Sequence, residues 1–121
     1  MAIGPQQDIS LHSGDSRTLR ITINDDAGAA LDITGATIKW QLSKKAADSV
    51  EPKGAFILSK GTTSTGIEIT DATGGICEVT LAPADTEALA GEFYHELQMT
   101  LDGSVSTVLF GQATIVKDLI Q

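Results

Sequence analysis

The chain has 121 residues, of which 8 are basic and 16 acidic, and its formal net charge is −8. This length fits one domain, and the excess of carboxylates repels phosphate backbones and anionic lipid, so we expect neither nucleic acid nor a membrane as a partner. Cys77 is the only cysteine, which excludes an internal disulfide and a cysteine-rich metal site.

The first eight residues differ in pattern from the rest of the chain. Residues 1–8 show no periodicity and predict a flexible N-terminal arm. They lack the basic and apolar regions of a secretion signal, so we expect synthesis and folding in a cytoplasm. Residues 9–121 are expected to form a single β-sandwich domain.

Alternating apolar residues mark the first strands of that domain. A weak strand is expected at Ile9–His12, and a stronger one over Ser16–Asn24, followed by an acidic and glycine-containing turn. The next strand places Ile38, Trp40 and Leu42 on one face and polar residues on the other. This period of two is typical of half-buried antiparallel strands.

The middle of the chain contains weaker strands and one short helix. Strands are expected at Phe56–Ser59 and Ile67–Ile69, and a clearer one at Cys77–Leu81. Pro83–Ala90 has proline at its start, early acidic residues and a glycine just past its end, which are helix start and stop signals. Because it is so short, we expect a connector and not a layer.

The last two strands form the most strongly predicted hairpin. The longest alternating row runs over Phe93–Leu101, and Asp102 followed by Gly103 is a strong signal for a tight turn. The returning strand is expected over Val105–Phe110, with an extension past Gly111 to Lys117. A glycine inside a strand often marks a bulge, so we expect one at Gly111.

Together these elements predict the fold class. About seven to nine short strands with one helical connector indicate an all-β antiparallel sandwich, and a small closed barrel is the alternative. Aromatic residues make up only 4% of the chain, so an aliphatic core is expected. The expected core anchors are Trp40, Phe93, Leu97, Ile21 and Ile38.

The residues that could carry chemistry are few. His12 lies beside Ser13 and Asp15, but neighbours on a strand point to opposite faces and do not converge as a triad. His95 falls on the apolar row of its strand, where a hydrogen-bonded core or interface residue is expected. Cys77 is expected to be a small buried hydrophobe. We therefore expect no catalytic, metal or cofactor site and no enzyme.

Contacts with other proteins are the expected activity of the surface. Trp40 is expected to be buried between two sheets, and an exposed binding aromatic is the alternative. Tyr94 points opposite to Phe93, as a corner tyrosine or as an oligomer contact. The polar stretch 44–54 and the N-terminal arm are expected to make contacts. The expected interface residues are Tyr94, Lys44, Lys45, Glu51 and Pro52.

Several segments, taken in order, resemble one family. The segments are 14–23 (GDSRTLRITI), 31–38 (LDITGATI), 75–81 (GICEVTL), 90–97 (AGEFYHEL) and 108–115 (VLFGQATI). This order is similar to the N-terminal domain of the upper baseplate protein of tailed phages and to related short phage and prophage tail proteins. The resemblance spans about Asp8 to Lys117. Its most distinctive parts are Asp32–Gly35 and Gly91 with the aromatic residues after it.

The resemblance implies an immunoglobulin-like sandwich in a multi-copy virion assembly, with no catalytic residue. It leads us to expect a virion protein of the tail or baseplate that contacts itself and other virion structural proteins as a homo-oligomer. Two alternatives are capsid decoration and a carbohydrate- or ligand-binding sandwich. In many relatives a long adhesion or linking segment follows this domain, and here the sequence stops at Gln121.

Overall fold

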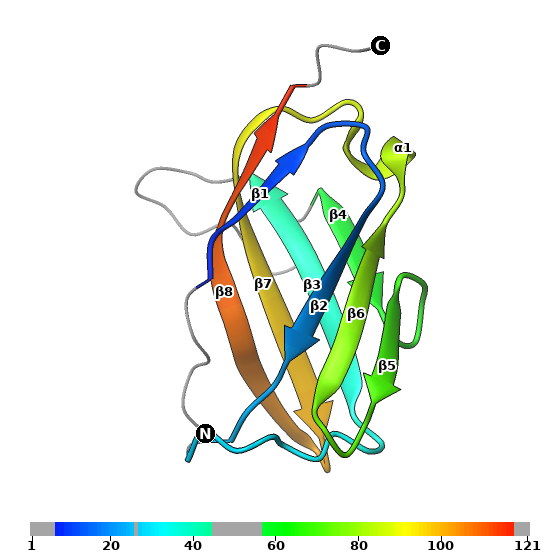
Figure 1. Ribbon diagram of the computed structural model, residues 1–121, viewed down its shortest axis with the longest axis vertical. Helices are drawn as coiled ribbons and strands as arrows, with labels where there is room; N and C mark the ends of the chain where they lie inside the picture. Colours follow the sequence, from blue (N-terminus) through cyan, green and yellow to red (C-terminus); the bar gives the residue numbers. More distant parts are fainter. Residues whose placement is uncertain (1–6, 26, 45–56, 118–121) are drawn as a thin grey trace.

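The computed structural model describes residues 7–25, 27–44 and 57–117 (Figure 1). Within these residues the chain forms eight strands and one helix. The strands are β1 (Ile9–His12), β2 (Arg17–Thr22), β3 (Thr37–Lys44), β4 (Leu58–Gly61), β5 (Ile67–Asp71), β6 (Ile76–Leu81), β7 (Gly91–Leu101) and β8 (Ser104–Val116), and the helix is α1 (Pro83–Thr86).

The strands form two sheets that pack face to face. One sheet has the order β1-β8-β7-β3-β4 and the other β2-β6-β5. All pairings are antiparallel except that of β1 with β8, which is parallel. In immunoglobulin domains, strands B, E and D lie side by side in one sheet, and strands C, F and G lie side by side in the other. Here β2-β6-β5 corresponds to B-E-D, β3-β7-β8 corresponds to C-F-G, and β4 takes the place of strand C′. The predicted all-β, immunoglobulin-like sandwich is therefore confirmed, and the closed barrel is excluded.

The interior between the sheets is filled by the inward-facing residues of each alternating strand. Ile38, Trp40 and Leu97 have no exposed surface, and Phe93 and Ile21 are 7% and 8% exposed. All five lie in one continuous cluster of buried residues. Burial of each such side chain contributes about 1.5–3 kcal/mol to folding, which makes this cluster the main source of stability.

The β7–β8 hairpin is the longest element and forms as the sequence predicts. Asp102 and Gly103 have φ angles of 52° and 83°, as a two-residue type I′ turn requires. Asparagine, aspartate and glycine tolerate this left-handed region best, because other side chains clash there. The turn sets the register that pairs Leu101 with Ser104 and, further along, His95 with Gly111.

The predicted bulge at Gly111 is wrong. The register instead shifts between Leu97 and Gln98, whose partners are Leu109 and Thr107, so Val108 is the extra residue. Gly111 is required for a different reason. A Cβ at this position would collide with the backbone carbonyl of Gln7, so the glycine admits a close approach of the N-terminal backbone.

Three other boundaries differ from the prediction. Helix α1 ends at Thr86 and not at Ala90, because the chain turns back with a bond from Leu89 N–H to the Thr86 carbonyl. The β4 strand is displaced toward the C-terminus of the predicted segment, and Phe56 lies outside the described residues. Of the predicted arm, residues 1–6 lie outside the described residues, whereas Gln7 and Asp8 are bonded to β8 and belong to the sandwich.

Candidate functional site

A hydrogen-bonded pair of polar rings lies in the centre of the core. The indole Nε1 of Trp40 on β3 donates to Nδ1 of His95 on β7 at 3.2 Å. The ring centroids are 6.1 Å apart, with the planes tilted by 50°. In antibody domains a tryptophan on this strand packs against a disulfide between the sheets. Here the single cysteine excludes that bridge, and the tryptophan contacts a histidine instead.

The second nitrogen of His95 extends this pair to the N-terminal backbone. Its Nε2 lies 2.7 Å from the carbonyl oxygen of Gln7. Because Trp40 donates to Nδ1, that nitrogen must be an acceptor, so Nε2 carries the proton and donates to Gln7. Both partners are therefore satisfied by the neutral imidazole. Burial lowers the pKa of His95, and the Gln7 carbonyl and the Asp8 carboxylate oppose this shift.

Two further bonds hold the N-terminal segment over the His95 ring. The N–H of Gln7 donates to the Phe110 carbonyl at 2.7 Å. The Asp8 carboxylate accepts from the N–H of Gln112 at 2.9 Å. These contacts, together with the close approach to Gly111, attach residues 7–8 to the middle of β8. The segment therefore forms one wall of the larger cavity described next.

A cavity of about 210 Å³ lies at the side of the sandwich between β1 and β2. Trp40 and His95 lie at its floor, although neither ring is exposed by more than 1%. The residues that line it are Gln7, Ile9, Arg17, Thr18, Leu19, Arg20, Ile21, Trp40, His95 and Leu109. Half of these residues are apolar and half are polar or charged, and both arginines of the chain stand at its β2 side.

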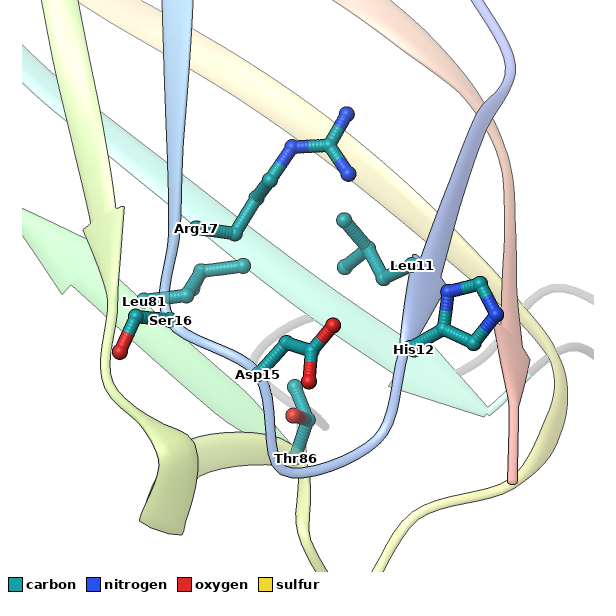
Figure 2. A pocket seen from close by; sticks show the side chains of 7 residues that line it. All are labelled: Leu11, His12, Asp15, Ser16, Arg17, Leu81 and Thr86. Carbon is teal, nitrogen blue, oxygen red and sulfur yellow. The ribbon is translucent and has the colours of Figure 1, made fainter. Parts of the chain in front are cut away.

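A second, much smaller cavity contains the residues that resemble a triad in the sequence (Figure 2). Its volume is about 30 Å³, which accommodates roughly one water molecule. His12 and Asp15 line it, but Ser13 is a separate buried residue. Figure 2 shows the Ser16 hydroxyl turned away from the His12 ring. The Ser16 hydroxyl is therefore not directed at the histidine.

The one thiol of the chain is buried at the centre of the three-stranded sheet. Cys77 has no exposed surface. Burial, with a smaller effect of the Glu78 charge, raises the pKa of Cys77 to about 11. The side chain stays a protonated thiol at neutral pH, and the thiolate is the reactive form. Its predicted identity as a small buried hydrophobe is confirmed.

The predicted interface residues fall in different parts of the molecule. Tyr94 is on the outer face of β7, where it pairs in register with Gln112 and Ser43, and its side chain is 37% exposed. Burial and the Glu96 charge raise the pKa of its phenol. Lys44 is the last residue of β3. Lys45, Glu51 and Pro52 lie outside the described residues.

Metal sites and membrane-spanning helices are both absent from residues 7–25, 27–44 and 57–117. No group of three or more histidine, cysteine, aspartate or glutamate residues is close enough there to hold a metal ion. No helix in that part of the chain is long and apolar enough to cross a bilayer. The acidic turn after β2 is explained by its own bonds, because Asp25 accepts from the N–H groups of Ala27 and Ala29 at 2.9 and 3.0 Å.

Sequence reasoning did not predict that a cavity lies beside the strand that carries both arginines. Arg17 and Arg20 are the only arginines of the chain, and both lie on β2. That clustering was visible in the sequence. The cavity was not, because its walls come from β1, β2, β3, β7 and β8 and meet only in the folded chain.

The comparisons with known proteins add little to this description. No family model matches the chain, and no curated protein matches it. A solved structure named "Tim-1" is similar over 98% of this chain and 99% of that chain, with 10% sequence identity and a TM-score of 0.45. By its strand order, the protein is an immunoglobulin-like β-sandwich domain.

Proposed function

We propose that this chain is a non-enzymatic structural subunit of a phage or prophage virion, located in the tail or baseplate. It acts through contacts with copies of itself and with other virion proteins. The observation that carries the proposal is that each sheet ends in strands whose outer backbone is unpaired within the described residues. These edge strands are β1 and β4 in one sheet and β2 and β5 in the other. Unpaired strand edges are ready sites for pairing with another chain.

The residues behind the family resemblance support the same proposal, because they shape the sandwich. Asp32 accepts bonds from the hydroxyl and the N–H of Thr34 at 2.6 and 3.0 Å, and these bonds lower its pKa. Gly35 follows with a φ of 81°. This local turn leads the chain into β3. These residues of the resemblance therefore contribute to the fold.

A second such residue is Gly75, in the turn before β6. Its φ is 71°, and a Cβ there would lie 2.5 Å from the Ile23 carbonyl and 2.7 Å from that of Leu31. Only glycine fits between these two backbone segments. The turn therefore holds the end of β2 against the connection to β3, and so fixes the position of the β2 edge.

Of the two aromatic residues that could bind a carbohydrate, Trp40 and Tyr94, only Tyr94 is exposed. Sugar recognition by Trp40 needs an exposed ring face, and Trp40 has no exposed surface. Tyr94 is exposed, but it lies on the outer face of β7 and does not line either cavity. Capsid decoration uses the same kind of contact as the proposed tail role and differs only in location.

The experiment that tests this function is detection of the chain in particles. Phage particles whose genome encodes this chain are prepared by gradient centrifugation. An antibody raised against the purified chain is applied to them, and the bound antibody is located by immunogold electron microscopy. Label at the tail or baseplate is the expected result. Label on the head would support capsid decoration instead. Particles that carry no label and contain no peptide of the chain by mass spectrometry would overturn the proposal.

A further inference from the structure

One side of the sandwich is open between the first two strands. Strand β1 is the edge of the five-stranded sheet, and β2 is the edge of the three-stranded sheet. Arg17 spans this opening, because its guanidinium reaches the Ser10 carbonyl on β1 at 3.4 Å. On one side of Arg17 is the 30 Å³ cavity, and on the other is the 210 Å³ cavity above Trp40 and His95.

Along this opening, the outer edge of β2 has backbone N–H and carbonyl groups that can pair with an added strand. The N–H of Ile23 donates to the Gly75 carbonyl at 2.7 Å, so Ile23 is a hydrogen-bonded position toward β6. In antiparallel pairing, hydrogen-bonded and non-hydrogen-bonded positions alternate. Ile21 and Leu19, two and four residues before Ile23, therefore also bond toward β6. The residues between and beside them direct their N–H and carbonyl groups away from β6, and these are Thr18, Arg20 and Thr22.

If a strand is added to the free edge of β2, its inward-facing side chains would point into the 210 Å³ cavity. Leu19 and Ile21 are the inward-facing residues of β2 and line the cavity, together with Ile9 and Leu109 across the opening. Side chains alternate along a strand, so every second residue of a segment paired to β2 would face the same space. A volume of about 210 Å³ can receive one or two aliphatic side chains.

The two arginines at the opening have the opposite sign to the net charge of the chain, although Asp15 also lines the smaller cavity beside Arg17. Arg17 and Arg20 are exposed on β2, in a chain whose net charge is −8. Within the described residues neither guanidinium forms an ion pair. Arg20 alternates with the inward-facing Leu19 and Ile21 and so projects on the outer side of the sheet, whereas Arg17 has the inward parity and reaches across the opening to β1. Guanidinium groups recognise carboxylates, so the outward residue of a bound segment opposite Arg20, and the end of the segment nearest Arg17, would be acidic.

We propose that β2 is a strand-addition site for an extended acidic segment of a partner protein. The segment pairs its backbone with Thr18, Arg20 and Thr22, inserts apolar side chains into the cavity over Trp40, and presents carboxylates to the two arginines. This inference rests on the assembly function proposed above and names the surface and the partner chemistry. A segment in which aliphatic residues alternate with aspartate or glutamate meets all three requirements.

Edge arginines also discourage unwanted pairing between sheets, and this simpler role makes a different prediction. Protective charges need no cavity behind them. The opposite edge of the same sheet, β5, carries Glu68 on its outer face and lines neither cavity. It serves as the internal control, since strand addition that needed only a free edge would occur there as well.

The test is an NMR titration of the full-length, ¹⁵N-labelled protein. The probe is the capped peptide acetyl-Thr-Glu-Ile-Glu-Ile-Glu-Thr-amide, in which isoleucine alternates with glutamate. The expected result is saturable shifts of the Thr18, Arg20 and Thr22 amides and of the Trp40 indole N–H, with the β5 amides unchanged. Two control peptides should cause shifts at least about tenfold weaker at equal concentration. One has lysine for glutamate, and the other has N-methylated glutamates, which are the residues whose N–H groups face β2 in antiparallel addition.

Variants separate the charge and the cavity contributions. The double variant Arg17→Gln with Arg20→Gln should raise the Kd of the peptide about tenfold, which fits the loss of two exposed charge pairs. Lys39→Gln, an exposed charge removed from β3, is the matched control and should leave the Kd unchanged. Leu19→Phe fills the cavity mouth without touching the edge backbone and should also weaken binding.

Each remaining outcome overturns the inference. Absence of shifts at millimolar peptide, shifts confined to β5 or β4, or equal Kd values for the arginine variant and Lys39→Gln would each contradict it. Shifts of the β2 amides that depend on protein concentration without peptide would assign the edge to a second copy of the chain. The assembly function would be untouched by these results if the antibody still labels the particles, so the two failures can be told apart.

Discussion

Acidification should destabilise the fold through one residue, His95. The neutral ring satisfies both Trp40 Nε1–H and the Gln7 carbonyl, and burial lowers its pKa from the ordinary 6.5. A proton added to Nδ1 would place an N–H against the indole N–H. The native state therefore resists protonation, whereas the unfolded chain takes up the proton freely. Stability attributable to this group is complete above the unfolded pKa and is lost as the pH falls below it.

The size of the effect follows from linkage. Below the unfolded pKa the free energy of unfolding falls by at most about 1.4 kcal/mol per pH unit, until the lowered pKa of the native state is reached. If the native ring stays neutral, the loss between pH 7.5 and 5.5 is about 1.4 kcal/mol. The Gln7 carbonyl and the Asp8 carboxylate favour the charged ring, so this value is an upper limit.

The assay is urea unfolding followed by tryptophan fluorescence at pH 7.5, 6.5 and 5.5. Trp40 is the only tryptophan and lies against His95, so its emission reports the relevant region directly. His12 is the only other histidine and is exposed, which makes His12→Gln the matched control. The pH dependence over this window should persist in His12→Gln and disappear in His95→Gln. An equal slope in both variants would refute this explanation of the buried pair.

Three further predictions concern the same core. Gly111→Ala should destabilise the fold by about 1–3 kcal/mol, because the new methyl group collides with the Gln7 backbone; faster hydrogen exchange at Gln112 should accompany the loss, and an unchanged urea midpoint would contradict it. Trp40→Phe should cost about 2–4 kcal/mol, since it leaves a void and removes the donor to His95; a loss below about 1 kcal/mol would show that the bond contributes little. Cys77, with a pKa of about 11, should react with a disulfide reagent at pH 8 far more slowly in the native protein than in urea, and comparable rates would contradict its burial.

The strands could be predicted from the sequence wherever period-two alternation was clean and a turn signal closed the segment. The β7–β8 hairpin is the best case, because alternation over Phe93–Leu101 and the Asp102–Gly103 pair specify the same register. The α1 boundary was less predictable, since Thr86 is buried and its hydroxyl accepts from the N–H of Gly14, 72 positions away. That contact depends on the tertiary fold and not on helix propensity.

Contacts between distant segments account for the rest of what the sequence did not reveal. Trp40 and His95 are 55 positions apart, and His95 and Gln7 are 88 apart. Alternation showed that both rings face inward, but not that they bond. The role of Gly111 was misassigned for the same reason, because the backbone that approaches it belongs to the N-terminal segment. The cavity at β2 likewise exists only once both sheets are assembled.

In the function proposed above, this sandwich acts as a repeated part of a particle and not as an isolated binding domain. Its most direct test is a cryo-electron microscopy reconstruction of phage particles whose genome encodes this chain. We predict several symmetry-related copies of the domain in the tail or baseplate, each with an extended neighbouring segment along β2. Particles reconstructed at side-chain detail in which no density fits this chain would contradict the claim.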